Sequence, residues 1–375
     1  MKRLFSVLFA ILSVCALSAQ RVCNVFGFPA TEPGYSLGVS ACYAGQIGDW
    51  LVVAGGCNFP TPGNKTYYSG IYAARIDRDV LSWRLVGMLP EPAAYGVAVA
   101  SGDSLLFVGG NNRDHGIRAV YSVRFDGAGE KATVSRLADL PAAVDNMAAA
   151  KCGGKVYVVG GNHDAKPSAG VLCADLSEGC REWKRLADLP GKPRVQPVCA
   201  ACGDGVYVWG GFFADGENSI VHTDGCRLDT RNGCWTALAA PKSDGGDELT
   251  LSGGIAWTDG CRILATGGVN KEIFLDAISG RYECVAKDDY LAQPIGWYRF
   301  SGNLCVFDTD TGEWRETVFA DRALARAGAQ AIPTAVGTFY IGGELKPALR
   351  TPQIVLLEVE RPAGGFACCG GTAGR

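Results

Sequence analysis

The stretch Val156-Tyr-Val-Val-Gly-Gly161 belongs to a pattern that recurs six times in the chain, an apolar strand that ends in two glycines. The other five copies occupy residues 51–56, 105–110, 206–211, 263–268 and 338–343. Successive glycine pairs lie about 50 to 57 residues apart, except for a last step of 75. A recurrence at this period predicts one structural unit repeated six times.

Within one unit the pattern predicts four strands. In the second unit they are expected at residues 93–100, 105–108, 119–125 and 132–137, separated by turn residues. The first of them is small and apolar, which suits a crowded inner strand. Most units also carry a later tryptophan, as at Trp83, Trp183, Trp235 and Trp314. Units of about 50 residues with these marks are typical of the kelch class of β-propeller. The fold class is therefore all-β, a six-bladed kelch-type β-propeller.

The two ends of the chain are expected to meet in the last blade. After Gly343 only one further strand fits, at residues 352–360. Residues 21–28 precede the first inner strand and have no blade of their own. We expect this N-terminal strand to close the last blade and remove an exposed edge. The propeller then spans residues 21–362, and residues 363–375 form a loose, glycine-rich tail.

The first 20 residues have the features of a signal peptide. Lys2 and Arg3 precede a short apolar run at residues 4–12, and residues 16–20 offer a cleavage region after residue 19 or 20. The sequence predicts export to the periplasm, with no membrane attachment after cleavage. A lipid anchor at Cys15 is the alternative, because Leu12-Ser-Val-Cys15 faintly resembles a lipoprotein signal.

Composition limits the partners. The net charge is −3 with no basic stripe, which argues against nucleic acid. Of the 16 cysteines, Cys173/Cys180 and Cys226/Cys234 flank short turns and could form disulfides; the alternative is that most cysteines are small buried hydrophobes. Cys-x-x-Cys occurs once, at residues 199–202, so neither a metal nor another cofactor is expected. A homodimer is left open.

One mouth of the predicted ring gathers the polar candidates. In a four-stranded blade, the loop after the second strand and the loop that enters the first strand open on the same side. Amides and aromatic rings there suit a sugar, and arginines suit a carboxylate on it. Any one of these residues could instead be structural. The candidate ligand-binding residues are Tyr95, Asn111, Arg194, Gln196 and Arg326. An insertion at residues 271–302, aromatic near its end, is either part of the site or a packing flap.

Glu344 and Arg350 differ from the other candidates because they lie six residues apart on one loop, stiffened by Pro347. The motif Gly343-Glu-x-Lys-Pro-x-x-Arg-Thr351 resembles the active-site loop of the bacterial N-acetylneuraminate epimerases, or sialic acid mutarotases. The resemblance is to their cyclically permuted branch, in which this loop lies near the C-terminus. Further stretches agree with it, at residues 54–60, 94–97, 193–197, 274–277 and 297–300.

The resemblance implies a function. It makes Glu344 the acid/base residue and Arg350 a ligand of the substrate carboxylate, with Arg194 or Arg326 assisting. The protein is then expected to be an isomerase that interconverts the α and β anomers of N-acetylneuraminate, an acidic sugar, without a cofactor. The alternative is a non-catalytic kelch propeller that binds a carbohydrate or a protein. A sialidase is disfavoured because the sequence lacks Ser-x-Asp-x-Gly-x-x-Trp boxes.

Overall fold

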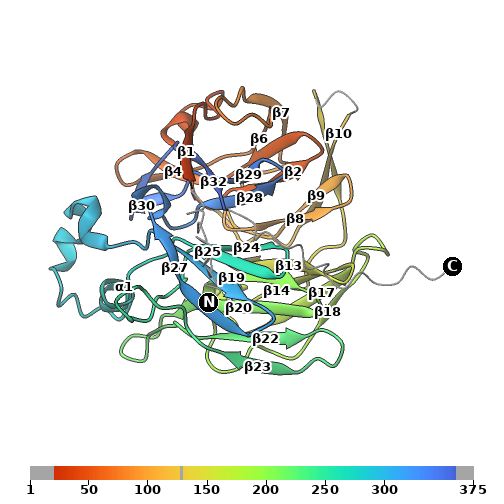
Figure 1. Ribbon diagram of the computed structural model, residues 1–375. Helices are drawn as coiled ribbons and strands as arrows, with labels where there is room; N and C mark the ends of the chain where they lie inside the picture. The colour runs from red at the N-terminus through yellow and green to blue at the C-terminus, as the bar shows by residue number, and fades with distance from the viewer. Residues whose placement is uncertain (1–20, 127–129, 360–375) are drawn as a thin grey trace, which may run out of the picture.

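The computed structural model describes residues 21–126 and 130–359, and six antiparallel sheets are arranged around a centre (Figure 1). Each has four main strands, and the fourth gains a short fifth strand at Ile220–Val221. The all-β, kelch-type propeller predicted from the repeat is confirmed. In each sheet the first strand of the unit is innermost. The first three blades are β2 (Tyr43–Ile47), β3 (Trp50–Ala54), β6 (Gly70–Arg75) and β7 (Arg84–Met88); β8 (Val97–Ser101), β9 (Ser104–Val108), β10 (Val120–Phe125) and β11 (Ala132–Arg136); and β13 (Ala148–Cys152), β14 (Lys155–Val159), β17 (Val171–Asp175) and β18 (Trp183–Arg185).

The last three blades follow the same order, and the sixth takes its outer strand from the other end of the chain. Strand β1 pairs antiparallel with β32, with Arg21 opposite Glu358 and Val25 opposite Ile354, as the sequence predicted. These blades are β19 (Val195–Cys202), β20 (Gly205–Phe213), β22 (Gly225–Asp229) and β23 (Trp235–Leu238); β24 (Ile255–Asp259), β25 (Arg262–Thr266), β26 (Asn303–Asp308) and β27 (Glu313–Ala320); and β28 (Gln330–Thr334), β29 (Gly337–Ile341), β32 (Ile354–Glu358) and β1 (Arg21–Val25).

The structure also contains short helices and strands that lie outside the main strands of the blades. The 3₁₀ helices are η1 (Tyr35–Leu37), η2 (Lys287–Ala292), η3 (Ile295–Tyr298) and η4 (Arg322–Leu324), and the α-helix is α1 (Lys271–Ile278). The short strands are β4 (Cys57–Thr61), β5 (Asn64–Tyr67), β12 (Val144–Asp145), β15 (Asn162–His163), β16 (Lys166–Pro167), β21 (Ile220–Val221), β30 (Glu344–Lys346) and β31 (Leu349–Arg350). The insertion at residues 271–302 therefore contains α1, η2 and η3, and it projects to one side of the ring, next to β30 (Figure 1).

The core lies between neighbouring blades rather than within any one of them. Each adjacent pair of sheets shares a buried apolar cluster, including the pair formed by the sixth blade and the first, where Phe339 and Leu356 pack with Leu51 and Tyr72. Because a single sheet cannot bury both of its faces, the six units stabilise one another.

The recurrent tryptophans bind four of the blades, the first, third, fourth and fifth, to the blade before each. The indole N–H of Trp183 donates to the carbonyl of Ala138 at 3.1 Å, and that of Trp314 donates to Ala239 at 3.0 Å. Trp83 donates to Gly27, just beyond β1, at 3.3 Å. The tryptophan therefore recurs because it combines apolar packing with one hydrogen bond to the preceding blade.

The paired glycines are required where one blade meets the next. Gly342 has a φ of 63°, and a Cβ atom on it would lie 2.5 Å from the carbonyl oxygen of Val39 in the first blade. The N–H of Gly343 donates to that same oxygen at 2.9 Å. A side chain at residue 342 would push the two blades apart, so the repeat keeps glycine there.

Six residues at the entry to the inner strands form a circle of backbone hydrogen bonds, which we call the axial ring. Each residue donates its N–H to the carbonyl of the preceding one at 2.7 to 3.0 Å, and Ala41 completes the circle by donating to Gly328. All six have a positive φ of 53° to 73°, which is uncommon for residues other than glycine. The members of the axial ring are Ala41, Tyr95, Asn146, Gln196, Gly253 and Gly328.

Cys173, Cys180, Cys226 and Cys234 are free thiols, so the two disulfides considered from spacing are not formed. Cys173 packs in the cluster between the third and fourth blades, whereas Cys180 packs in the cluster between the second and third. Cys226 is buried and Cys234 is exposed. The alternative interpretation, small buried hydrophobes, holds for Cys173, Cys180 and Cys226.

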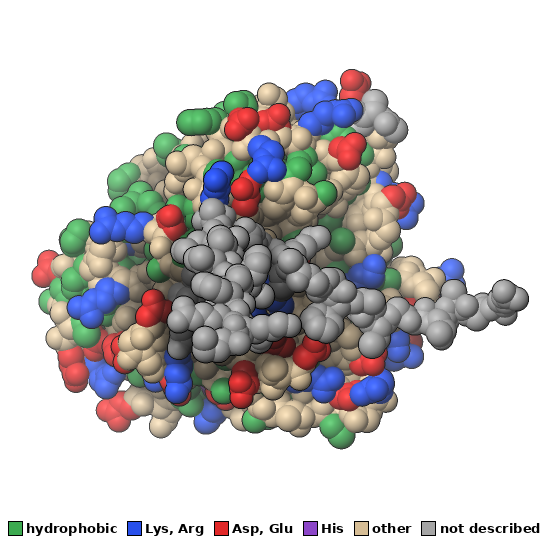
Figure 2. Space-filling model, in the orientation of Figure 1, with side chains coloured by type: hydrophobic (Ala, Val, Ile, Leu, Met, Phe, Trp, Pro, Cys, Tyr) green, Lys and Arg blue, Asp and Glu red, His purple; other side chains and the backbone are tan. Residues whose placement is uncertain are grey.

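The surface carries both signs of charge. On the face visible in Figure 2, Lys and Arg alternate with Asp and Glu, in keeping with a net charge of −3. Among the described residues, no helix is long and apolar enough to cross a membrane. The predicted signal peptide, Cys15 and the tail at residues 363–375 lie outside the described residues.

Candidate functional site

A cavity of about 240 Å³ opens on the axis of the ring. All six inner strands and the loops that enter them contribute to its wall, and Glu344 joins them from the loop after the last glycine pair. Deeper in the channel the wall is small and apolar, with Ala98, Ala149 and Ala331. The inner strands are rich in alanine because their side chains converge on this narrow axis.

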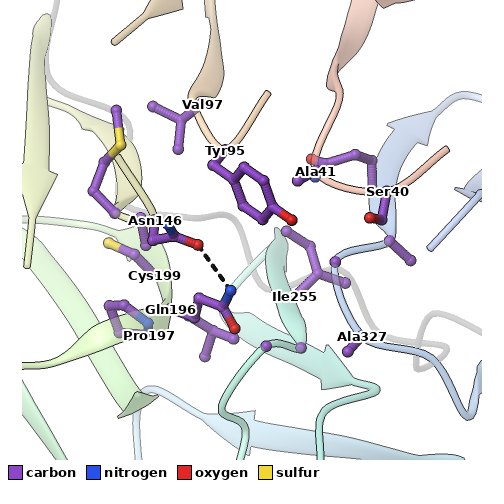
Figure 3. A pocket seen from close by; sticks show the side chains of 18 of the residues that line it. Ser40, Ala41, Tyr95, Val97, Asn146, Gln196, Pro197, Cys199, Ile255 and Ala327 are labelled. Carbon is purple, nitrogen blue, oxygen red and sulfur yellow. Dashed lines mark hydrogen bonds between the residues drawn. The ribbon is translucent and has the colours of Figure 1, made fainter. Parts of the chain in front are cut away.

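The axial ring gives the cavity a polar half and a bare half. Tyr95, Asn146 and Gln196 present polar side chains around the opening, and the amide of Gln196 is hydrogen-bonded to that of Asn146 (Figure 3). Gly253 and Gly328, which complete the ring opposite, have no side chain. A ligand on the axis would therefore meet hydrogen-bonding groups on one side only of the ring itself.

Glu344 projects over the bare half from the β30–β31 hairpin. The backbone of Glu344 exchanges two hydrogen bonds with Ala327, next to Gly328, at 2.7 and 3.0 Å. The hairpin turns at Pro347 and Ala348, the latter with a φ of 65°, so that Glu344 and Arg350 lie opposite each other in register. The Arg350 Nη1 donates to the Glu344 Oε2. The sequence spacing of six thus becomes a direct contact across a tight turn.

The environment of Glu344 favours its protonated form. Burial raises the pKa of Glu344 above its ordinary value, while the positive charges of Arg350 and Lys65 act in the opposite direction. The side chain is 24% exposed, on the cavity wall. Glu344 is therefore a carboxyl group on the cavity wall whose protonated form is more accessible than that of an exposed glutamate.

Arg350 does not face the cavity. Its side chain is 5% exposed, its guanidinium lies 5.1 Å from the centre of the Phe59 ring, and it is absent from the cavity wall. The expectation that Arg350 binds the substrate carboxylate directly is not met by this geometry, because Glu344 occupies its accessible nitrogen. Arg350 instead holds the carboxylate of Glu344 in place.

A second hairpin, β4–β5, supplies a cation that sequence reasoning missed. The Nζ of Lys65 donates to the Tyr95 hydroxyl at 2.8 Å and lies 4.3 Å from the centre of that ring. The thiol of Cys57 approaches the same hydroxyl at 3.5 Å. Burial raises the pKa of Tyr95 well above its ordinary value, so its hydroxyl stays protonated. Lys65 and Glu344 both lie in the connection between the second and third strands of their blades, in the first and the last unit, and this shared connection was the available signal.

Arg194 and Arg326 lie in the wall between blades. Arg326 is fully buried, and it donates to the carbonyls of Gly342 and Gln353 at 2.9 and 2.8 Å and to the Gln353 side chain at 2.7 Å. Arg194 makes the equivalent contacts with Gly210 and Asp224. Neither lines the cavity. The expectation that they face a substrate is therefore not met; they brace the glycine turns of the fourth and sixth blades.

Asn111 also lies outside the cavity wall. Its backbone N–H donates to the carbonyl of Ala94 at 2.8 Å, and its carbonyl accepts the N–H of Ala94 at 2.9 Å. Its Oδ1 is buried and has no hydrogen-bond partner among the described residues. Of the predicted site residues, the structure thus brings Glu344, Tyr95 and Gln196 together on the cavity, with Arg350 directly behind Glu344.

The insertion contacts the Glu344 hairpin. Lys346, two residues after Glu344, donates its Nζ to the carbonyls of Leu291 and Gln293 at 3.0 and 2.7 Å. The same ammonium lies 5.9 Å from the centre of the Tyr298 ring. Tyr290 is close enough for the charge of Glu344 to contribute to the raised pKa of its hydroxyl, although burial is the larger cause. The aromatic part of the insertion therefore packs against the outer side of the site.

Comparisons with known proteins show the family of this chain. The family model described as N-acetylneuraminate epimerase matches residues 137–363, more than half of the chain. Proteins named N-acetylneuraminate epimerase from Haemophilus influenzae (strain PittEE) and Pasteurella multocida (strain Pm70) are each 29% identical, over 225 and 230 residues. These matches cover 57% and 58% of this chain and 57% of each relative, so the chain spans a little over half the length of the curated relatives it matches.

A solved structure shows the same architecture over nearly the whole chain. The structure titled "Structure of YjhT" superposes with a TM-score of 0.63, covering 87% of this chain and 96% of the other, at 14% sequence identity. At that identity the likeness concerns the fold alone. The matched family model, together with a carboxyl group and its arginine beside the axial cavity, shows that this chain belongs to the N-acetylneuraminate epimerase family.

Proposed function

We propose that this protein interconverts the α and β anomers of N-acetylneuraminate, with Glu344 as the proton-transferring group. The observation that carries the proposal is the position of Glu344, a carboxyl group with a raised pKa on the wall of the axial cavity. Membership of the family supports the choice of substrate, since the matched relatives are named for that activity.

The chemistry requires two proton transfers. To open the sugar ring, a proton leaves the anomeric hydroxyl and another reaches the ring oxygen; closure on the other face reverses both. A single carboxyl group can serve each step in turn if both of its protonation states are accessible. Burial of Glu344 raises its pKa, while Arg350 and Lys65 limit the rise. Raising the pKa of a carboxyl group in this way suits it to act as both acid and base.

The structure revises the role of Arg350 in the proposal. Since the guanidinium is engaged by Glu344, it orients the reacting carboxylate instead of the substrate. We assign the substrate carboxylate to Lys65, which is not itself in the cavity wall but has its ammonium 2.8 Å from the hydroxyl of Tyr95, a residue of that wall. The hydroxyl of Tyr95, kept protonated by burial, is a further donor at the same edge of the cavity.

We further propose that the protein acts after export to the periplasm. The support is the arrangement of Lys2, Arg3 and the apolar run at residues 4–12. An acidic sugar offered from outside the cell would be the substrate met there.

The test is Glu344→Gln, which keeps the shape of the side chain and removes its titration. We expect the anomerisation rate, measured by NMR exchange on freshly released α-N-acetylneuraminate, to fall by about 10² to 10⁴ while the sugar still binds. Glu248→Gln is the matched control, because Glu248 is exposed, lies outside the cavity wall and accepts a hydrogen bond from the Thr223 hydroxyl. An unchanged rate in Glu344→Gln would remove Glu344 from the mechanism. A wild-type protein that binds the sugar without accelerating exchange would instead be a sugar-binding propeller.

A further inference from the structure

A buried carboxylate lies directly behind the polar half of the cavity. Asp145, at the end of β12, is 8% exposed. Its Oδ1 accepts the Nδ2 of Asn146 at 2.6 Å and the Nδ2 of Asn162 at 2.8 Å. Asn162 reaches it from β15, where it is the register partner of Asp145. The carboxylate is therefore satisfied by two amide N–H groups, one from the next residue along the chain and one from β15.

This carboxylate decides which way the neighbouring amides point. An ionised carboxylate only accepts hydrogen bonds, so Asn146 must turn its Nδ2 toward Asp145. The Oδ1 of Asn146 then faces the other way, and it accepts the Nε2 of Gln196 at 2.8 Å (Figure 3). Gln196 has thus used one of its two N–H groups and has its orientation fixed, and its Oε1 is left as an acceptor. The hydrogen bonds therefore run in one direction: Gln196 donates to Asn146, and Asn146 donates to the buried carboxylate of Asp145.

The Oε1 of Gln196 is uncovered where the chain reaches Gly253. A Cβ atom on Gly253 would lie 3.4 Å from this oxygen, and glycine leaves the space open. Among the described residues no protein group donates to it. Asn146 and Gln196 are also held by the hydrogen-bonded axial ring, with φ values of 53° and 54°, so the backbone beneath the amides is fixed.

We infer that Gln196, oriented through Asn146 by Asp145, forms a subsite that binds a hydrogen-bond donor of the ligand, a hydroxyl or an amide N–H. The inference rests on the proposed function and adds the orientation of the sugar. Glu344 bonds to Ala327, next to Gly328 of the axial ring, and Gly328 stands two positions from Gln196 around the six-membered ring. The anomeric centre at Glu344 and the donor at Gln196 therefore occupy separate parts of the cavity, with Gly253 between them. Asp145 does not touch the ligand and is a positioning residue.

The first experiment is titration calorimetry of the full chain with N-acetylneuraminate. Gln196→Met keeps the length of the side chain and removes the acceptor. We expect its affinity to fall by about tenfold, because a donor of the sugar loses its partner, with KM raised and kcat little changed. Gln46→Met is the control, since Gln46 lies outside the cavity wall and bonds only to Gly48 among the described residues. Wild-type affinity in Gln196→Met would overturn the subsite.

The second experiment tests whether Asp145 sets the orientation of the amides of Asn146 and Gln196. Asp145→Asn lets the amide of residue 145 point either way, so we expect weaker binding even where thermal unfolding shows an intact fold. Adding Asn146→Asp moves the carboxylate one residue along, where it again accepts the Nε2 of Gln196, and affinity should return to within a few-fold of wild type. A merely structural role for Asp145 predicts no such rescue, so a double variant as weak as Asp145→Asn contradicts the inference.

Two further outcomes separate this inference from the proposed function. If N-acetylneuraminate fails to bind the wild-type protein, the proposed function and the subsite fall together. If the sugar binds and Glu344→Gln abolishes exchange while Gln196→Met binds normally, the function stands and only the subsite fails. Analogues with one methylated hydroxyl or amide then identify the donor, because the relevant analogue loses no further affinity in Gln196→Met.

Discussion

Arg350 donates its Nη1 to the Oε2 of Glu344 across a hairpin of only seven residues, and it does so from behind the cavity wall. The arginine is 5% exposed and the glutamate 24% exposed, so a ligand on the axis reaches the carboxyl group first. The pair therefore works as a reacting group with a fixed positive support. This relationship makes the protonation of Glu344 depend on Arg350.

The first prediction concerns pH. Arg350 lowers the pKa that burial raises on Glu344, so Arg350→Gln should raise that pKa further. The ionised form, which takes the proton from the anomeric hydroxyl, then appears only at higher pH. We expect the acidic limb of the kcat–pH profile to shift upward in this variant. A limb at the wild-type position would mean that Glu344 is not the titrating base.

The second prediction concerns Lys65. Lys65→Met removes the ammonium that donates to Tyr95 and leaves the apolar part of the side chain. We expect three- to tenfold weaker binding of N-acetylneuraminate at low ionic strength, on the order of 1 kcal/mol. The difference from wild type should shrink as salt is added, because the charge lies near the cavity edge. An affinity loss of equal size for a neutral sugar would show that Lys65 acts by packing alone.

The third prediction separates bracing from binding at Arg326. Arg326→Met leaves three oxygens of Gly342 and Gln353 without their donor, and should lower the free energy of unfolding by roughly 3 kcal/mol. KM of the folded fraction should stay unchanged, since Arg326 does not line the cavity. Arg136→Met is the control, because Arg136 forms an exposed ion pair with Asp139 that contributes little. A raised KM with normal stability would restore Arg326 to the substrate site.

The fourth prediction tests the glycine pairs. Gly342 and Gly102 have nearly equal φ values, 63° and 60°, but only Gly342 has a close neighbour, the oxygen of Val39. A Cβ atom on Gly102 would meet nothing within 4 Å. Chemical unfolding should therefore show a loss of about 1 kcal/mol for Gly102→Ala, from backbone strain alone, and a clearly larger loss for Gly342→Ala. Equal losses would mean that the contact between blades adds nothing.

Much of the fold could be predicted because the same pattern of strands and glycine turns occurs six times in the sequence. The four strands expected between residues 93 and 137 match β8 to β11, although the inner strand begins at Val97 rather than at residue 93. The residues before Val97 were read as strand because they are apolar, whereas Tyr95 takes a positive φ to join the axial ring. Pairing of β1 with β32 followed from counting strands. The spacing of the cysteine pairs suggested disulfides that are not formed, because spacing along the chain does not say which face of a sheet a side chain occupies.

The site was predicted in part. Glu344, Tyr95 and Gln196 were expected at the mouth and lie there, because position within the unit decides which end of a strand a residue occupies. Arg194 and Arg326 occupy the same position in the fourth and sixth units, and both were expected at the mouth. Their side chains instead turn away from the axis and donate to carbonyls of the glycine turns. Lys65 was missed because its role depends on Tyr95, a residue of the next blade.

The sequence by itself determined the number of blades, the order of strands, the joining of the two ends and the loop that holds Glu344, since each depends on periodicity along the chain. Only the tertiary structure decided which polar groups face the axis and which are used up as braces. That choice depends on hydrogen bonds between blades, such as Asn146 to Gln196 and Lys65 to Tyr95, which join residues 50 and 30 positions apart. A buried polar group turns toward whichever partner satisfies it, and that partner is known only once the blades are side by side.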